Sequence, residues 1–245
     1  MKTKKYKALL LAAGFGTRLR PLTNELPKCL VKIGEFPIIE HWLRKIEKMN
    51  VEEVLINTHY LSNKVNSYLL SRPSSNLKIS LVYEDKLLGT AGTLINNKKF
   101  FKNSDILFIH VDNFTLDDLT GLFDFHESHE DNDKVLLTML VFKARNPKSC
   151  GIVTLDDKGF VDSFEEKVFS PKGNLANGAV YLFKDSLIDF IIKYIPNAHD
   201  FSLDILPRLI NKMKTWQTNY EYIDIGTHEN LLLARKYYSE NNSKF

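Results

Sequence analysis

Glycines and cations are concentrated in residues 11–30, LAAGFGTRLRPLTNELPKCL, directly after a short apolar run. Gly14 and Gly16 carry no side chain, so backbone amides there can approach a ligand closely. Arg18 and Lys28 can bring positive charge to an anionic group. The combination favours a polyphosphate ligand, and a glycine turn with surface cations is the alternative. The third glycine of the dinucleotide fingerprint and the GK[ST] of a P-loop are both absent.

Two aspartates are candidate partners for such a loop. Asp112 follows the apolar run 105–111, and Asp224 lies in the strand-like segment YEYIDI, residues 220–225. In proteins Mg²⁺ usually takes one or two carboxylates together with substrate phosphates and keeps several waters. The two aspartates could therefore hold a metal beside a bound polyphosphate. Aspartates after strands also often cap the next helix or turn, which is the alternative reading.

The first half of the chain alternates apolar runs with amphipathic stretches. This pattern predicts a doubly wound, mostly parallel, Rossmann-like sheet with right-handed crossovers, in an α/β fold. Ligands of such sheets bind beyond the carboxyl ends of the strands, where the basic loop begins. The expected strands are 6–12, 52–58, 77–84 and 105–111, and the expected helices are 37–50 and 63–71.

The second half predicts a β-rich extension of the same sheet. No linker or repeat separates the halves, so we expect one domain over residues 1–245, with halves at about 1–130 and 131–245. Turn signals such as DDKG and SPKGN divide the strand-like runs. The expected strands are 134–142, 150–156, 160–167, 177–183 and 220–225, with helices at about 184–195 and 202–213 and a last helix from about 227.

Composition excludes several classes of protein. The net charge of +3 is nearly balanced, which argues against a general nucleic-acid binder. No apolar run approaches the roughly 20 residues that a bilayer span needs, so we expect no membrane association. Cys29 and Cys150 form neither a disulfide framework nor a zinc motif. These features favour a protein of the reducing cytoplasm.

Short motifs recur along nearly the whole chain: LAAGFGTRLRPLT with PKCL, INTHYL, LLGTAGTL, HVDNF, FEEK, NLANGAVYLF, DFSLDILPRLI and YIDIGTHENLLLA. In this order they resemble the motifs of the sugar-1-phosphate nucleotidylyltransferases, closest to their mannose-1-phosphate guanylyltransferase-like members. The resemblance implies a GT-A-like nucleotidyltransferase fold whose β-rich extension binds the sugar. It also implies Mg²⁺ as cofactor, with a nucleoside triphosphate and a sugar 1-phosphate as substrates.

The resemblance also assigns roles to individual residues. Arg18, Lys28 and Asp112 are the implied catalytic residues, and Asp112 and Asp224 the implied metal ligands. The implied nucleotide contacts are Leu11, Ala13, Gly14, Gly16, Thr17, Arg18, Glu84, Gly89 and Thr90. The implied contacts to the sugar phosphate are Asn113, Gly151, Glu166, Lys167 and Asn177. The alternative for FEEK, which contains Glu166 and Lys167, is a solvated charge run on an edge strand.

The motifs GTAG and NTHYL most resemble those of members that use GTP, and this resemblance implies GTP together with a mannose-like hexose or heptose, or an amino sugar. Glu84 would accept hydrogen bonds from a purine, or would be a solvated carboxylate at a strand end. Val111, Cys150 and Ala179 depart from the family pattern, which leaves the acceptor sugar open. The alternatives are UTP, dTTP or CTP as donor, and a catalytically silent regulatory subunit that binds nucleotide sugars. Homo-oligomers are compatible with the sequence.

Overall fold

The computed structural model describes residues 5–129 and 132–241, which divide into two compact units that interleave along the chain. We call one the loop unit, because it contains the glycine-rich segment, and the other the hairpin unit, after its antiparallel strand pair at 151–166. Within 5–129 and 132–241, no helix is long and apolar enough to cross a membrane. The loop unit consists of 6–87, 109–118 and the residues from 220 onward; the hairpin unit consists of Lys5, 88–108 and 119–219.

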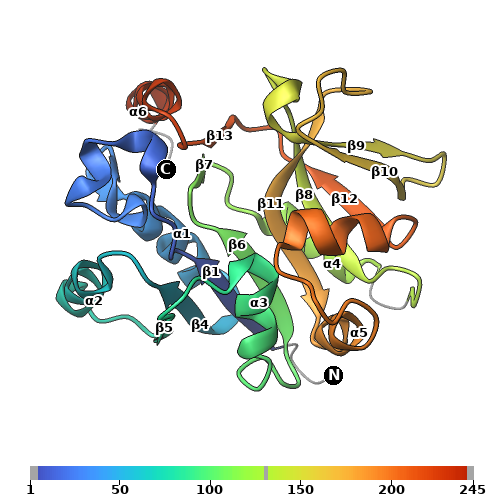
Figure 1. Cartoon of the computed structure of the whole chain (residues 1–245), viewed down its shortest axis with the longest axis horizontal. Coiled ribbons are helices and arrows are strands. Elements are labelled where there is room, and N and C mark those ends of the chain that lie inside the picture. The colour runs from blue at the N-terminus through green and yellow to red at the C-terminus, as the bar shows by residue number, and fades with distance from the viewer. Residues whose placement is uncertain (1–4, 130–131, 242–245) are drawn as a thin grey trace. The chain divides into compact units, whose positions relative to one another are not determined.

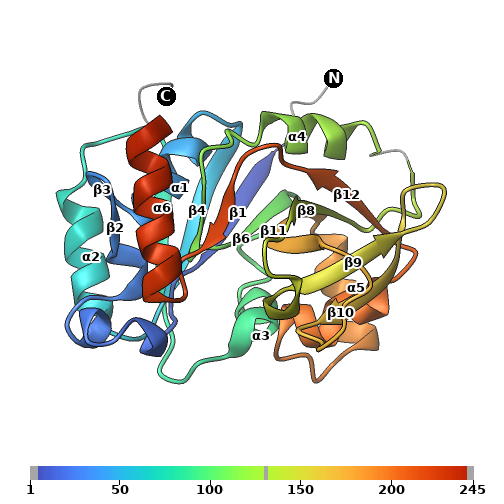
Figure 2. The same ribbon diagram turned by 90° about the horizontal axis from the view of Figure 1, so that it is seen from above.

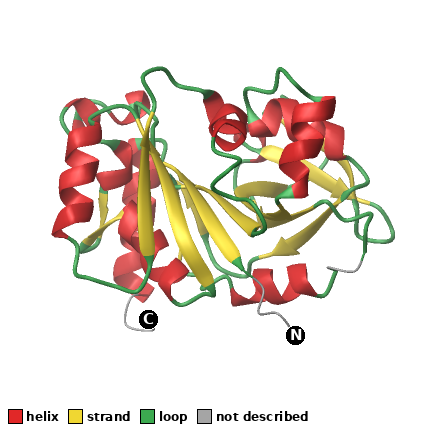
Figure 3. Ribbon diagram, turned by 90° about the horizontal axis from the view of Figure 1, so that it is seen from below, coloured by secondary structure: helices red, strands yellow, loops and turns green. Residues whose placement is uncertain are grey.

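Three parallel strands form the centre of the loop unit (Figure 3). Strand β4 (Val51–Thr58) lies between β1 (Tyr6–Leu11) and β5 (Lys78–Tyr83), with Leu9 opposite Leu55 and Leu55 opposite Ser80. The connections run through α1 (Ile38–Glu47) and α2 (Ser62–Ser71) (Figure 1). Parallel strands joined by helices are the arrangement that the alternating pattern predicts, so this part of the fold is confirmed.

Helix α1 forms because its apolar residues recur on one face. Ile38, Ile39, Trp42, Leu43 and Ile46 are all buried, and Pro37 precedes the first turn, where its missing N–H is not needed. The indole N–H of Trp42 donates to the carbonyl oxygens of Val111 and Asn113, at 3.1 and 2.9 Å. The helix core therefore fixes the backbone on both sides of Asp112.

The remaining elements of the loop unit are short strand pairs and one C-terminal helix. Strand β7 (Asn113–Thr115) pairs antiparallel with β13 (Tyr222–Asp224), with Asp224 opposite Asn113. Strand β2 (Lys32–Ile33) pairs with β3 (Phe36–Pro37), and α6 (His228–Asn241) follows β13. Strand β6 (Asp105–His110) continues from the hairpin unit into the loop unit at Ile109.

The hairpin unit is rich in strands, as the sequence predicts, and most of these strands pair antiparallel. Strand β11 (Leu175–Lys184) pairs antiparallel with β8 (Leu137–Lys143) and, at Ala176, with β9 (Gly151–Leu155). Strand β10 (Val161–Glu166) pairs with β9 to form the hairpin (Figure 2). The helices of this unit are α3 (Gly89–Asn96), α4 (Thr120–Glu127) and α5 (Ser186–Tyr194).

The hairpin unit departs from the sequence expectations at two places. The helix expected at 202–213 is a π-helical turn, Phe201–Ile205, followed by a 3₁₀ turn, Leu206–Leu209. Pro207 has no N–H to continue an α-helix, and the chain instead enters β12 (Met213–Gln217), which pairs parallel with β8. The segment LLGTAGTL, which is not among the expected helices, forms most of α3.

Candidate functional site

The glycine-rich loop leaves β1 and folds into three short 3₁₀ turns, Thr17–Leu19, Leu22–Asn24 and Lys28–Leu30. Gly16 has φ of +63°, and a Cβ there would lie 3.0 Å from the Cβ of Lys28. Its carbonyl accepts a 2.7 Å hydrogen bond from the Thr23 hydroxyl. A glycine is therefore needed at position 16 to bring Lys28 close, whereas a Cβ at Gly14 would touch nothing within 4 Å.

Asn57, which the sequence reasoning missed, holds the start of this loop. Its side-chain oxygen accepts from the Ala12 backbone N–H at 2.8 Å, and its amide donates to Glu84 at 3.0 Å. The Nδ1 of His59 lies 2.7 Å from the backbone oxygen of Glu84, so this nitrogen carries the proton, since a carbonyl only accepts. The sequence signal that could have identified Asn57 is its position near the end of a buried strand, where polar side chains of such sheets gather around ligands.

Glu84 is buried, with 4% of its surface exposed. The alternative of a solvated carboxylate at a strand end is therefore wrong. The hydrogen bond from Asn57 explains why the carboxylate tolerates burial, because buried polar groups need partners. Phe15, between the two glycines, packs edge-on against His59 with ring centroids 5.3 Å apart. The nucleotide contact expected of Glu84 stays a prediction.

Lys28 contacts both candidate metal ligands. Its Nζ lies 2.6 Å from Asp112 and 3.5 Å from Asp224, and only 12% of its side chain is exposed. Arg18 approaches the other oxygen of Asp224 at 3.9 Å. The Ile225 backbone N–H donates to the Asp112 carbonyl oxygen at 2.9 Å, which ties the two aspartates together through the main chain. The structure thus gathers four residues that lie far apart in the sequence, which we call the charge cluster.

The two carboxylates of the charge cluster differ in pKa. Burial opposes ionisation of Asp112, but the charges of Lys28 and His110 outweigh it, so the pKa of Asp112 lies below its usual value. Burial and the neighbouring charge of Asp112 raise the pKa of Asp224, and Lys28 and Arg18 offset this only in part. The first carboxylate is therefore the more strongly held anion.

The oxygen donors of the charge cluster suit Mg²⁺. No group of three or more His, Cys, Asp or Glu side chains that could hold a metal occurs in the described part of the chain. Mg²⁺ does not need such a group, because it binds through one or two carboxylates and completes its shell with waters and substrate phosphates. Asp112 and Asp224, held around one ammonium group, offer that donor set.

The other candidates of the loop unit lie around the same loop and strand. Leu11 ends β1, and Ala13 and Thr17 belong to the glycine-rich loop. Asn113 is buried at the start of β7, where its amide donates to the His110 carbonyl oxygen at 3.2 Å. That bond fixes the turn which carries Asp112, so Asn113 already has a structural role.

Gly89 and Thr90, by contrast, lie in the hairpin unit, at the start of α3. Gly89 has φ of +76°, and a Cβ there would overlap His199. The Thr90 hydroxyl accepts from the Phe201 backbone N–H at 2.6 Å and lies 3.4 Å from Asp200. Both residues therefore hold α3 against the π-helical turn, and their nucleotide contacts stay predictions.

Gly151, Glu166 and Lys167 come together on the β9–β10 hairpin. Glu166 is directly opposite Gly151 in the register, and a Cβ at Gly151 would overlap the Glu166 carboxylate. The Lys167 ammonium lies 3.0 Å from Glu166, and Lys167 has φ of +52°, a left-handed conformation that is unfavourable for lysine. The backbone N–H of Lys167 donates to the Cys150 carbonyl oxygen at 3.0 Å.

Asn177 lies at an irregularity of β11. The register with β8 shifts between Asn177 and Tyr181, and Ala179 has φ of +52°. The Asn177 oxygen accepts from the Ala179 N–H at 2.9 Å, and its amide donates to the Tyr181 hydroxyl at 2.7 Å. The bulge aims Asn177 differently from a regular strand position. We call Gly151, Glu166, Lys167 and Asn177 the hairpin-unit set.

Known proteins resemble this chain over most of its length. A family model described as nucleotidyl transferase matches residues 7–241. The mannose-1-phosphate guanylyltransferase of Mycobacterium tuberculosis is 29% identical, over 86% of this chain and 57% of that protein. The UTP–glucose-1-phosphate uridylyltransferase of Synechocystis is 28% identical, over 90% of this chain and 60% of that protein. The chain spans about half the length of the first curated relatives that it matches.

A solved structure shows the same fold. HddC from Yersinia pseudotuberculosis, complexed with GMP-PN, superposes with a TM-score of 0.77 and 25% sequence identity, covering 94% of this chain and 98% of that one. This likeness confirms the predicted Rossmann-like nucleotidyltransferase fold.

Proposed function

Because the chain belongs to the nucleotidyl transferase family, we propose that it transfers a nucleoside monophosphate from a nucleoside triphosphate to a sugar 1-phosphate. The products are a nucleotide sugar and pyrophosphate. The observation that carries the proposal is the contact of Lys28 with both Asp112 and Asp224, next to Arg18 and the glycine-rich loop. A binding module has no need of cations and carboxylates gathered so closely, which argues against a silent regulatory subunit.

In the proposed reaction, a phosphate oxygen of the sugar 1-phosphate attacks the α-phosphorus. The new oxygen–phosphorus bond forms as the bond to the β-phosphate oxygen breaks, and pyrophosphate leaves with that electron pair. Catalysis of such a transfer is mostly positioning and electrostatic stabilisation. Arg18 binds the triphosphate, and Lys28 stabilises charge at the α-phosphate. Asp112 and Asp224 would hold Mg²⁺, which would neutralise phosphate charge.

The hairpin-unit set binds the acceptor in this proposal. Lys167 pairs with the phosphate of the sugar 1-phosphate, while Glu166 and Asn177 bind sugar hydroxyls together with the backbone amide of Gly151. A carboxylate that accepts from two hydroxyls makes strong, charge-assisted hydrogen bonds. The contact of Lys167 with Glu166 supports this, because it keeps an anion-binding and a hydroxyl-binding group side by side.

We favour GTP as donor and a mannose-like hexose or heptose 1-phosphate as acceptor. The buried carboxylate of Glu84 supports a guanine, since guanine offers N–H donors to an anionic acceptor. The guanylyltransferase relative and the GMP-PN complex of HddC point the same way, whereas the uridylyltransferase relative keeps UTP as an alternative.

The test is pyrophosphate release by the purified protein, measured for five nucleoside triphosphates and a panel of sugar 1-phosphates, with Mg²⁺ or with EDTA. We expect the fastest turnover with GTP and a mannose or heptose 1-phosphate, and none in EDTA. Turnover with UTP alone would contradict the proposed base. Tight binding of nucleotide sugars without turnover for any pair would contradict the enzyme.

Glu84→Gln sharpens the choice of base. Glutamine keeps an oxygen to accept from Asn57 but removes the negative charge, so the loop anchor should survive. The ratio of kcat/KM for GTP to that for UTP should fall by roughly 10-fold, the value of one charge-assisted hydrogen bond. An unchanged ratio would remove Glu84 from base selection.

A further inference from the structure

The first turn of α6 contacts both the loop that carries the cations of the charge cluster and the backbone of its carboxylate Asp224. The His228 Nε2 lies 3.0 Å from the carbonyl oxygen of Arg20, in the segment between Arg18 and Lys28. The Asn230 amide donates to the carbonyl oxygen of Asp224 at 2.8 Å. Two side chains of one helical turn therefore bind the backbone of the cationic loop and the backbone of a carboxylate ligand.

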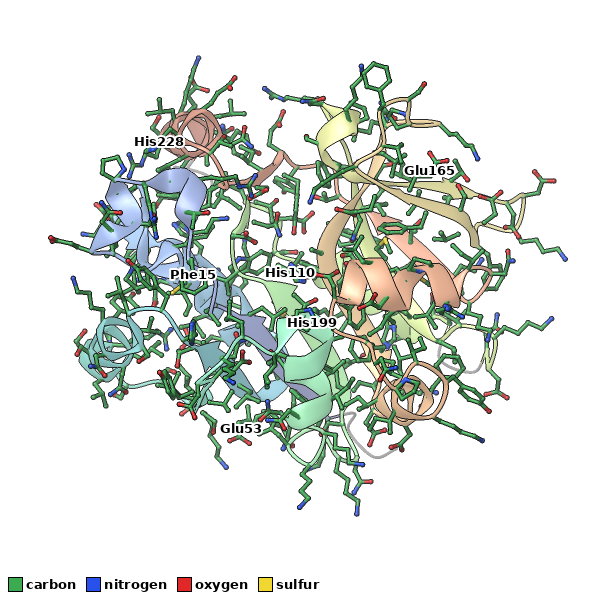
Figure 4. All side chains as sticks on the ribbon, in the orientation of Figure 1. Phe15, Glu53, His110, Glu165, His199 and His228 are labelled. Atoms are coloured by element: carbon green, nitrogen blue, oxygen red, sulfur yellow. The ribbon has the colours of Figure 1, made fainter. Side chains whose placement is uncertain are left out.

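The direction of the His228 hydrogen bond follows from its partner. A carbonyl oxygen accepts only, so Nε2 of His228 must carry a proton, and the neutral and the charged ring can both donate. His228 is exposed at the start of α6 (Figure 4), and its Nε2 donates to the loop backbone at Arg20.

The chain around His228 is fixed locally. The Thr227 hydroxyl accepts from the Asn230 N–H at 3.2 Å, and the Thr227 carbonyl accepts from the Leu231 N–H at 2.9 Å. Leu231 is buried and anchors this end of the helix. The positions of His228 and Asn230 are therefore set by the helix itself, independently of the loop.

Gly226 adds a close approach in the same segment. A Cβ at this position would lie 2.5 Å from the Arg18 guanidinium and 3.0 Å from the Asp224 carboxylate. The Arg18 side chain therefore packs against backbone at the junction of β13 and α6. The junction and the first turn of α6 therefore contact the cationic loop at Arg18 and Arg20, and they also contact Asp224.

We propose that the first turn of α6 sets the position of the cationic loop relative to Asp224, with His228 as a positioning residue for triphosphate binding. His228 acts through the Arg20 carbonyl and Asn230 through the Asp224 carbonyl; neither touches substrate. The proposal rests on the proposed function for its link to turnover, but its effects on nucleotide and metal binding are measured without turnover.

The test compares His228→Ala, His228→Gln and Asn230→Ala by calorimetric titration with GTP and, separately, with Mg²⁺. His228→Ala loses one hydrogen bond, so it should bind GTP roughly 2- to 10-fold more weakly than the wild type and bind Mg²⁺ equally well. Asn230→Ala should weaken Mg²⁺ binding by a similar factor. His228→Gln, which can still donate, should restore most of the GTP affinity. If the wild type turns over, KM for GTP should rise in His228→Ala while kcat changes less.

Glu229→Gln is the matched control, because Glu229 is exposed in the same turn between the two test residues. It should bind GTP and Mg²⁺ as the wild type does. Equal GTP affinity of His228→Ala and wild type would overturn the proposal, as would His228→Gln binding as weakly as His228→Ala. Melting temperatures separate loss of position from loss of folding. A wild type that binds GTP but never turns over would contradict the proposed function and leave the binding comparison valid.

Discussion

The charge cluster of the loop unit and the hairpin-unit set hold their functional side chains by different means. In the charge cluster, Lys28 contacts two carboxylates, and paired strands and the Trp42 indole fix the backbone beneath them. In the hairpin-unit set, left-handed backbone at Lys167 and Ala179 sets the geometry. Opposite charges in one place and backbone geometry in the other should therefore respond differently to substitution.

The largest effect should come from Asp112→Asn in the charge cluster. This change removes a proposed metal ligand and the 2.6 Å partner of Lys28, so turnover should fall by about 10²- to 10³-fold, as for other positioned charges at reacting groups. The measurement is steady-state pyrophosphate release at saturating Mg²⁺. Asp124→Asn, at an exposed position of α4, is the matched control and should keep wild-type turnover. A fully active Asp112→Asn would show that the charge cluster is not the metal site.

The next effect concerns the pH dependence of stability. The pKa of Asp112 is lower in the folded protein than in the unfolded chain, so its stabilisation is full above the unfolded value and is lost as pH falls through the folded value. Lys28→Met removes the charge that contributes most to lowering the pKa of Asp112. The pKa of both aspartates should therefore rise. The unfolding free energy should then fall most at neutral pH, and the gap to wild type should narrow below about pH 4.

Urea unfolding between pH 3 and pH 7 measures this gap. The pKa of Asp224 is already raised in the folded protein, and loss of Lys28 raises it further, so Asp224 widens the gap at neutral pH in the same direction as Asp112. Lys236→Met is the control, since the pair of Lys236 with Glu240 is exposed at 3.9 Å and should contribute little at any pH. A gap that is constant across pH would mean that Lys28 stabilises the fold by packing rather than by charge.

A smaller effect is expected from Glu166→Gln in the hairpin-unit set. Glutamine removes the charge that pairs with Lys167 and that would bind sugar hydroxyls. KM for the sugar 1-phosphate should rise roughly 10- to 100-fold, the value of a charged hydrogen bond, while KM for the triphosphate stays unchanged. Asp157→Asn, in the exposed turn of the same hairpin, should change neither constant. A rise in both constants would contradict the assignment of Glu166 to the acceptor.

The residues of the charge cluster could be predicted from the sequence, because glycines, cations and aspartates that follow apolar runs are typical of phosphate and metal sites. Buried strands precede Asp112 and the glycine-rich loop, so the carboxyl ends of strands could be located from apolar runs alone. The contact of Lys28 with both aspartates was not accessible, since it depends on the pairing of β7 with β13. Asn57 and His228 were missed because each acts on a backbone atom of a segment distant in the sequence.

The hairpin unit was less predictable because backbone conformation decides more of it. The apolar run at 202–213 fits helical spacing, yet Pro207 and the parallel pairing of β12 with β8 override it. The left-handed conformations of Lys167 and Ala179 have no sequence signal, since neither residue favours that region. Local preference and the final structure disagree at these positions, which is typical of functional or strained sites.

The smallest expected effect is on stability alone. It tests most directly whether strained backbone, rather than side-chain contacts, sets the geometry in the hairpin unit. Ala179 has φ of +52°, where a Cβ costs roughly 1 kcal/mol, so Ala179→Gly should relieve strain. Glycine also loses more conformational entropy on folding, so the net gain in unfolding free energy should be at most about 1 kcal/mol. Ala176→Gly is the matched control in the same strand: Ala176 is buried without a left-handed φ, and glycine there should destabilise by about 0.5–1 kcal/mol. Opposite signs in urea unfolding would show that strained backbone sets the geometry near Asn177, whereas equal destabilisation would mean that the bulge is relaxed and that side-chain contacts hold both regions.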